Sequence, residues 1–202
     1  MKIVCLDLEG VLVPEIWIAF SQVAGIKELE RTTRDEPDYD KLMAFRLDIL
    51  TRKGLKLPDI QKVISGMTPL PGALEFTAAL RAKTQLIILS DTFEQFAAPL
   101  MKQLSYPTLF CNTLIAKEDG TLISWKLRQK NGKKEAVRAF KQCNFDVFAA
   151  GDSFNDLAMI EEAGSGCLFR APESIIKAYP NITCVEDYNA LMSRIDEFLV
   201  RE

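Results

Sequence analysis

The sequence opens with MKIVCLDLEGVLVPE, residues 1–15, and this stretch predicts both a central strand and a reactive site. Residues 3–6 are an apolar, β-favouring run that is long enough for a buried strand. The run stops at Asp7 and Glu9, which lie two positions apart and therefore point the same way from an extended chain. Two acids at the end of a buried strand are costly unless a cation or a reacting group lies between them. Solvated turn acids are the alternative, and these residues alone leave both interpretations open.

Length and composition indicate an ordinary globular protein. The chain has 202 residues, enough for one domain or for one domain with a small insert. Apolar residues make up 48% and charged residues 26% of the sequence, which argues against disorder. The net charge of −3 gives no electrostatic signature of nucleic-acid binding, and no apolar stretch is long enough to span a bilayer. We expect neither a nucleic-acid partner nor a membrane anchor.

The counts of histidine and cysteine limit the side chains that could serve in catalysis or metal binding. The sequence contains 0 histidines, which excludes histidine-based triads and histidine-ligated zinc. Any acid–base catalysis must therefore use Asp, Glu, Lys, Tyr or Cys. The 5 cysteines are scattered without a CxxC pair, and they indicate reduced, mostly buried thiols in a cytoplasmic protein.

Helical patterns follow the opening stretch directly. Apolar residues recur at helical spacing in three segments, residues 14–25, 39–52 and 57–67. The polar residues 27–40 predict a loop or a short helix. We expect residues 14–69 to form a helical cap that folds over the site, and residues 1–13 and 70–202 to form the core domain.

Beyond residue 70, strand-like runs alternate with helical patterns. The strand-like runs are residues 86–89, 108–116, 121–127, 145–149, 167–169 and 182–185. The helical patterns are residues 71–80, 93–104, 132–143, 156–163, a segment from 172, and 188–200. Asp119-Gly120 is a strong hairpin signal between the second and third runs. The alternation predicts an α/β fold with a doubly wound parallel sheet, as in Rossmann-like proteins.

Three of the predicted core strands end in polar side chains, namely Asp7/Glu9, Ser90/Asp91 and Asp152/Asp156. The carboxyl ends of parallel strands meet at one edge of a sheet, so we expect these groups to lie together. Asp7 and Asp152 supply anionic oxygens, which suit Mg²⁺ when combined with backbone carbonyls and water. A structural metal site would use the same carboxylates.

A phosphate site would also need a hydroxyl donor and a fixed cation. Ser90 supplies a hydroxyl beside the N-terminus of the following helix, and Lys133 at a helix N-terminus can reach a phosphate oxygen. Singly, Ser90 is more often a helix cap and Lys133 more often a solvated lysine. Their placement at one predicted sheet edge favours a phosphate site.

Four ordered motifs resemble those of the haloacid dehalogenase superfamily. They are Asp7–Val11, Ser90 after an apolar strand, Lys133, and GDSFND at residues 151–156. The helical segment between the first two motifs is similar to the small cap of the phosphoserine phosphatase branch. Within that branch, LDLEGVLVPE (residues 6–15), ILSDTF (88–93) and LRQK (127–130) resemble the bifunctional phosphoserine/homoserine phosphotransferase type.

The resemblance implies a two-step phosphoryl transfer. Asp7 would attack the phosphoryl group to form an aspartyl-phosphate, and Glu9 would protonate the leaving seryl oxygen. Glu9 would then deprotonate water or an acceptor alcohol such as homoserine. Most phosphatases of the superfamily carry aspartate at this position, and we hypothesise that the longer Glu9 favours an acceptor bulkier than water.

The resemblance also implies a cofactor and a binding site. Mg²⁺ would be held by Asp7, the Glu9 carbonyl and Asp152, with Asp156 orienting the site behind them. The phosphate would be held by Ser90, the Asp91 backbone, Lys133 and Asn155. In the cap, Glu15 would meet the substrate ammonium and Arg46 its carboxylate, which suits the planar fork of arginine. For both cap residues the alternative is a solvent-facing helix charge.

The expected function is a Mg²⁺-dependent phosphoserine phosphatase that also transfers the phosphoryl group to homoserine. One alternative is a phosphatase of another small phosphate monoester, because caps vary more readily than cores. A non-enzymatic phospho-acceptor switch would not need the cap or the acid–base Glu9. A catalytically dead binding module would not keep every catalytic position filled. The expected partners are small molecules, and homodimerisation stays open.

Overall fold

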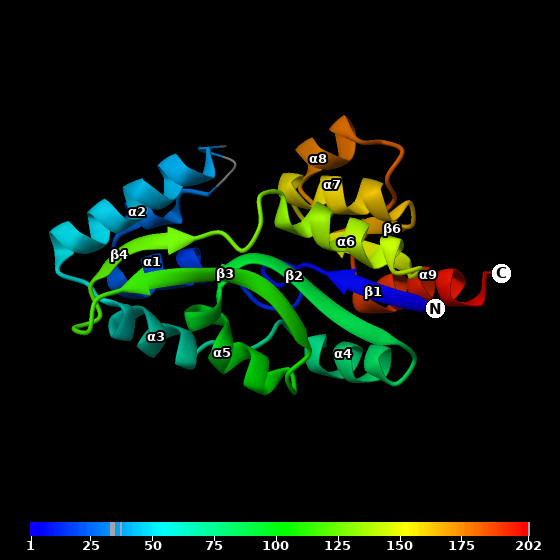
Figure 1. The fold of residues 1–202 in the computed structure, drawn as a ribbon, viewed down its shortest axis with the longest axis horizontal. Helices are drawn as coiled ribbons and strands as arrows, with labels where there is room; N and C mark the ends of the chain where they lie inside the picture. The colour runs from blue at the N-terminus through cyan, green and yellow to red at the C-terminus, as the bar shows by residue number, and fades with distance from the viewer. Residues whose placement is uncertain (33–34, 37, 202) are drawn as a thin grey trace.

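The computed structural model describes residues 1–201 except residues 33, 34 and 37. Seven strands form one sheet in the order β4-β3-β2-β1-β5-β6-β7, with β1 near its centre (Figure 1). The strands are β1 Lys2–Leu6, β2 Gln85–Phe93, β3 Thr108–Ala116, β4 Leu122–Lys126, β5 Asp146–Gly151, β6 Gly166–Phe169 and β7 Cys184–Val185. All neighbours pair in parallel except β3 and β4, which form the expected antiparallel hairpin.

Helices cover both faces of the sheet, which confirms the doubly wound α/β fold. On one face lie α4 Ala73–Arg81 and α9 Tyr188–Val200, and on the other lie α6 Gly132–Gln142, α7 Phe154–Ala163 and α8 Glu173–Ala178 (Figure 1). The central strand β1 alternates between the two cores: Val4 and Leu6 join one apolar cluster, Ile3 and Cys5 the other. Its two buried faces explain why these residues form an unbroken apolar run.

The segment between β1 and β2 begins with three helices and a short 3₁₀ turn. They are α1 Ile16–Ala24, η1 Lys27–Glu30, α2 Tyr39–Lys53 and α3 Leu57–Ser65. The first helix begins two residues after the predicted Pro14, and Glu15 is its N-cap. α5 Glu94–Gln103 follows β2. In Figure 1, α1, α2 and α3 gather around the β3–β4 hairpin at the end of the molecule away from the termini.

The tip of the β3–β4 hairpin is attached to the start of α3. The Leu57 amide donates to the Gly120 carbonyl at 2.9 Å, and Lys56 forms an ion pair with Asp119 at 2.8 Å. A Cβ atom on Gly120 would lie 2.8 Å from Pro58 Cδ, so this close approach requires glycine. A segment that we assigned to the core therefore packs on the predicted cap, residues 14–69, and the division into cap and core stays a prediction.

The second strand extends beyond its predicted end. β2 continues through Ser90 and Asp91 to Phe93, and its register with β3 is irregular between Leu89 and Phe93. Pairing of Phe93 with Asn112 keeps the chain extended after the apolar run has stopped. Ser90 and Asp91 therefore lie in the irregular part of the strand rather than after it.

None of the helices in the described residues combines the length and the apolar character that a bilayer crossing requires.

Candidate active site

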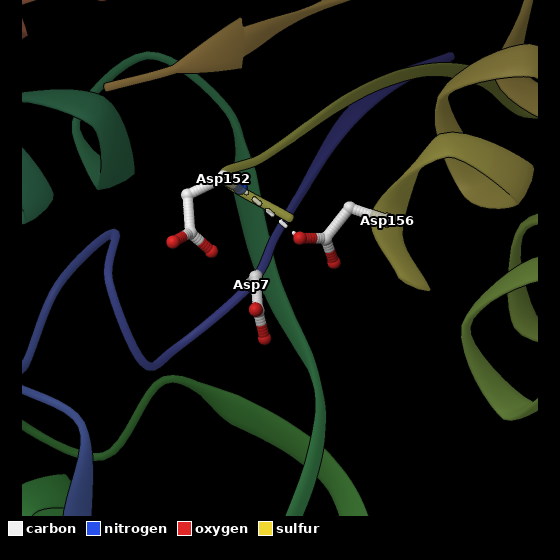
Figure 2. Close-up of side chains that lie close together, drawn as sticks. All are labelled: Asp7, Asp152 and Asp156. Carbon is white, nitrogen blue, oxygen red and sulfur yellow. Dashed lines mark hydrogen bonds between the residues drawn. The ribbon is translucent and has the colours of Figure 1, made fainter. Parts of the chain in front are cut away.

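Three buried carboxylates meet where β1 and β5 end. Asp7 follows β1, Asp152 follows β5, and Asp156 lies in the first turn of α7 (Figure 2). One oxygen from each of them lies within 4.8 Å of the others. The parallel pairing of β1 with β5, extended by a hydrogen bond from the Asp7 amide to the Ala150 carbonyl at 3.0 Å, brings the two strand ends together. Three buried acids at this spacing are costly unless a positive charge lies beside them or one of them is protonated.

The Asp156 carboxylate accepts hydrogen bonds from the loop that carries Asp152. Its Oδ2 accepts hydrogen bonds from the amides of Asp152 and Ser153, each at 3.0 Å, and from the Ser153 hydroxyl at 3.0 Å. A Cβ atom on Gly151 would lie 2.2 Å from Asp156 Cγ, so glycine lets the carboxylate pack against the end of β5. Asp156 thus fixes the backbone that carries Asp152.

Lys133 is a cation in direct contact with this cluster. It is the second residue of α6, its side chain is only 5% exposed, and its Nζ lies 2.6 Å from Asp156 Oδ1 and 3.0 Å from Asp7 Oδ1. The same Nζ is 3.9 Å from Asp91 Oδ2. Burial alone would lower the pKa of Lys133, but the charges of Asp156 and Asp7 outweigh it and raise that pKa well above its ordinary value. Lys133 is therefore a permanent cation, in contrast to the solvated lysine considered from the sequence.

The environment of Asp7 disfavours its charge. Burial, followed by repulsion from Asp156, raises the pKa of Asp7 well above its ordinary value, and Lys133 opposes that shift. Asp7 Oδ1 accepts hydrogen bonds from the Leu8 amide at 2.7 Å and faces Lys133. A further cation at the cluster would therefore stabilise the ionised carboxylate.

Glu9 is attached to the N-terminus of α1. Its Oε2 accepts the amide hydrogen of Ile16, the first residue of that helix, at 2.8 Å. Burial raises the pKa of Glu9, while the Ile16 amide, the Thr92 side chain and Arg46 partly oppose the shift. A carboxyl group with a raised pKa is suited to donate and accept a proton near neutral pH.

The predicted phosphate ligands converge beside Lys133. Ser90 is buried, and its Oγ accepts the Thr92 amide hydrogen at 3.2 Å. Asn155 donates through Nδ2 to Asp91 Oδ2 at 2.7 Å, which joins the start of α7 to the irregular end of β2. Ser90, Asn155 and Lys133 line the same cavity, which therefore has a hydroxyl, an amide and an ammonium group at its wall.

The two predicted cap residues face the same cavity. Arg46, on α2, is 6% exposed, and its guanidinium lies 4.5 Å from the Trp17 ring centroid. One terminal nitrogen donates to the Arg31 carbonyl at 2.8 Å. Burial lowers the pKa of Arg46 to about 10, with Glu9 and Glu15 opposing the shift, so the side chain is still charged at neutral pH. Arg46 is not the solvent-facing helix charge that the sequence left open.

The structure brings the predicted residues into one place. Every predicted site residue other than Asp156 lines a single cavity, and Asp156 lies behind it. Sequence reasoning missed Trp17, Thr32, Tyr39 and Thr92, which also line this cavity. Thr92 adjoins the Ser90-Asp91 motif, and that position was an available signal. Tyr39 carried no signal, because its place in the helical pattern of α2 is typical of a core residue.

Comparisons with known proteins agree with this arrangement. A family model described as haloacid dehalogenase-like hydrolase matches residues 1–164. The chain is 53% identical over 191 residues to a protein named phosphoserine phosphatase from Pseudomonas syringae pv. tomato, covering 95% of this chain and 81% of that protein. It is also 53% identical over 191 residues to phosphoserine phosphatase ThrH from Pseudomonas aeruginosa, covering 95% and 93%.

Solved structures share the fold. A substrate-bound phosphoserine phosphatase complex matches with a TM-score of 0.77 at 23% identity, over 98% of this chain and 97% of the other. A phosphoserine phosphatase in its apo form matches with a TM-score of 0.76 at 24% identity, over 93% and 94%. The family match across residues 1–164 confirms the resemblance carried by the four motifs: this chain belongs to the haloacid dehalogenase-like hydrolases, a family of enzymes.

Proposed function

We propose that the protein is a phosphoserine phosphatase that works through a covalent aspartyl-phosphate. The observation that carries the proposal is the meeting, in one cavity, of a nucleophile–acid pair, Asp7 and Glu9, with a buried guanidinium, Arg46. The 53% identity to two proteins named phosphoserine phosphatase supports the same substrate. A solved structure described as a phospho-aspartyl intermediate analogue of phosphoserine phosphatase shares the fold with a TM-score of 0.76.

In the first step, a carboxylate oxygen of Asp7 attacks phosphorus and the bond from phosphorus to the seryl oxygen breaks. Glu9 donates its proton to the leaving oxygen, which its raised pKa favours. In the second step, the ionised Glu9 takes a proton from the incoming hydroxyl, which attacks phosphorus and regenerates Asp7. Ser90, Lys133 and Asn155 hold the phosphoryl oxygens through both steps.

The residues of the acidic cluster fit a magnesium ion. The cluster offers carboxylate oxygens, which magnesium prefers, and two of its carboxylates, Asp7 and Asp156, contact Lys133. Asp7, the Glu9 carbonyl and Asp152 would hold the ion, and Asp156 would orient the loop of Asp152. The bound ion would neutralise charge on the phosphoryl group during transfer.

The cap residues supply recognition of the amino acid. Arg46 would bind the substrate carboxylate bidentately, since its guanidinium is buried and oriented by Trp17. Glu15, at the N-cap of α1, would bind the substrate ammonium. Both side chains border the cavity that also contains Asp7 and Ser90, so one molecule could reach all of them.

We further propose that the phosphoryl group can pass to homoserine instead of water. The longer Glu9 side chain and the resemblance of residues 127–130 support this part of the proposal. Homoserine carries the same ammonium and carboxylate groups as serine, so Glu15 and Arg46 would orient it in the same way.

The test is phosphate release from L-phosphoserine with Mg²⁺, with and without L-homoserine, while O-phosphohomoserine is followed. Both products should form and should be lost in Asp7→Asn. Phosphate release without O-phosphohomoserine would contradict the transferase activity alone. No turnover of phosphoserine in either assay would contradict the assigned substrate and would point to another phosphate monoester.

A further inference from the structure

A cap tyrosine contacts the backbone of the phosphate-binding segment. Tyr39 is the first residue of α2, it is half-buried, and its hydroxyl donates to the Asp91 carbonyl at 3.1 Å. Tyr39 and Asp91 are 52 positions apart in the chain, and both border the site cavity. This contact therefore joins the predicted cap to the segment that would hold phosphate.

The Asp91 carbonyl has a second donor, from the hairpin. Asn112 on β3 donates through Nδ2 to this carbonyl at 3.1 Å, and its Oδ1 accepts the Arg128 amide hydrogen at 3.0 Å. Both ends of the Asn112 side chain are therefore engaged, which fixes its orientation. Tyr39 and Asn112 therefore donate to the same carbonyl oxygen, one from α2 and the other from β3.

The peptide held in this way also contacts the Ser90 hydroxyl. The Asp91 carbonyl and the Thr92 amide belong to one planar trans peptide, so fixing the carbonyl fixes the direction of the N–H group. That N–H group donates to Ser90 Oγ at 3.2 Å. Because this oxygen already accepts a hydrogen bond, the Ser90 proton is left to donate to a phosphate oxygen. Hydrogen bonding to the carbonyl also polarises the peptide and strengthens its N–H donor.

The other strand of the hairpin, β4, contacts the helical turn that contains Tyr39. Trp125 on β4 donates through Nε1 to Asp40 Oδ1 at 3.2 Å, next to Tyr39 in the first turn of α2. The Asp38 side chain accepts the amide hydrogens of Asp40 and Lys41, each at 3.1 Å, and caps the same turn. The first turn of α2 is therefore held by its own cap and by the hairpin.

We propose that Tyr39 is a positioning residue that couples the placement of α2 to the phosphate-donating hydroxyl of Ser90 through the Asp91–Thr92 peptide. The proposal rests on the proposed function in that it takes Ser90 as a phosphate ligand. Burial, together with the charge of Asp91, raises the pKa of Tyr39, which keeps its hydroxyl protonated and able to donate.

The test is the affinity of the magnesium-loaded protein for inorganic phosphate, measured by titration calorimetry. Tyr39→Phe removes the hydroxyl and keeps the ring, and phosphate affinity should fall roughly 3- to 10-fold, as for one lost hydrogen bond in a network. Tyr188→Phe is the matched control, because the Tyr188 hydroxyl donates to the Val11 carbonyl at 2.7 Å and does not border the cavity. Its phosphate affinity should equal that of the wild type. Wild-type affinity in Tyr39→Phe would overturn the proposal.

A double-mutant cycle separates coupling through Ser90 from a general structural effect. In a Ser90→Ala background, Tyr39→Phe should no longer change phosphate affinity, because the hydroxyl through which it acts is gone. An equal loss in both backgrounds would overturn the proposal. Phosphoserine turnover is measured in parallel. A wild type that binds phosphate but does not hydrolyse phosphoserine would contradict the proposed substrate only, and a wild type that does not bind phosphate would contradict both.

Discussion

Lys133 and Asp156 form a buried ion pair, with 2.6 Å between Nζ and Oδ1, behind the cavity that Asp7 and Asp152 line. Lys133 also contacts Asp7, because the same Nζ lies 3.0 Å from Asp7 Oδ1. Asp156 in turn accepts both backbone amides of the loop that carries Asp152. This pair therefore positions the proposed nucleophile Asp7 and the proposed metal ligand Asp152 together, although only Lys133 borders the cavity.

The first prediction concerns the stability contribution of that pair. Asp156→Asn should destabilise the protein by roughly 1–3 kcal/mol, because a neutral amide weakens the hydrogen bonds to the loop of Asp152, while Lys133 keeps Asp7 as a partner. Asp196→Asn breaks an exposed pair with Lys83 of similar length, 2.7 Å, and should cost less than about 1 kcal/mol. Urea denaturation of both variants measures the difference. Equal losses in the free energy of unfolding would mean that the buried Asp156 contributes no more to stability than the exposed Asp196.

Much of this site was predictable because it depends on short-range patterns. The apolar run before Asp7 and the one before Gly151 identified buried strands, and parallel strands bring their carboxyl ends together regardless of sequence separation. The placement of Asp7, Asp152 and Lys133 follows from that geometry and from the position of Lys133 at a helix start. These features needed no knowledge of side-chain packing.

The remainder depends on long-range contacts that no local pattern encodes. The end of β2 was misplaced because Ser90 and Asp91 are polar, whereas pairing of Phe93 with Asn112 keeps the chain extended. The burial of Arg46 arises from its packing on Trp17, a residue from another helix. The proposed role of Tyr39 depends on the β3–β4 hairpin, whose Trp125 is 85 positions from Asp40, so the helical periodicity of this segment could indicate only a packed residue.

The second prediction concerns the glycine that follows Glu9. Gly10 has φ +77°, and a Cβ atom there would lie 2.4 Å from Asp152 Oδ2. Gly10→Ala should therefore displace the Asp152 carboxylate and lower kcat with phosphoserine by at least about 10-fold, since small misplacements are costly in catalysis. Gly25→Ala is the matched control: its φ is +66°, but no atom lies within 4 Å of the added Cβ.

The control should lose about 1–2 kcal/mol of stability from the left-handed backbone and should keep wild-type kcat. Steady-state kinetics and thermal unfolding of both variants separate the two effects. A Gly10→Ala protein with wild-type turnover would show that the Asp152 carboxylate can move without loss.

The third prediction concerns the magnesium ion that we propose for the acidic cluster. Mg²⁺ at about 100 times its dissociation constant should stabilise the protein by roughly 2.7 kcal/mol. For a chain of this size, that energy corresponds to a rise in Tm of about 5–10 °C. Asp152→Asn should abolish most of the rise, whereas Asp196→Asn, at the exposed pair with Lys83, should retain it. Thermal scans with and without Mg²⁺ give the comparison, and an equal rise in all three proteins would place the ion elsewhere.

The last prediction concerns the choice between water and an alcohol as acceptor. The carboxylate of Glu9 reaches the Ile16 amide at the start of α1 at 2.8 Å, and burial raises its pKa. In Glu9→Asp the side chain is one methylene shorter, so the carboxyl group should withdraw from Ile16 and from a bulky acceptor hydroxyl, while a small water can still approach. The ratio of O-phosphohomoserine to free phosphate should therefore fall several-fold relative to wild type. Both products are quantified from phosphoserine at fixed homoserine, with Glu9→Gln as the control that lacks an acid–base group and should form neither product efficiently. If Glu9→Asp partitions the phosphoryl group as the wild type does, the length of Glu9 does not set the acceptor.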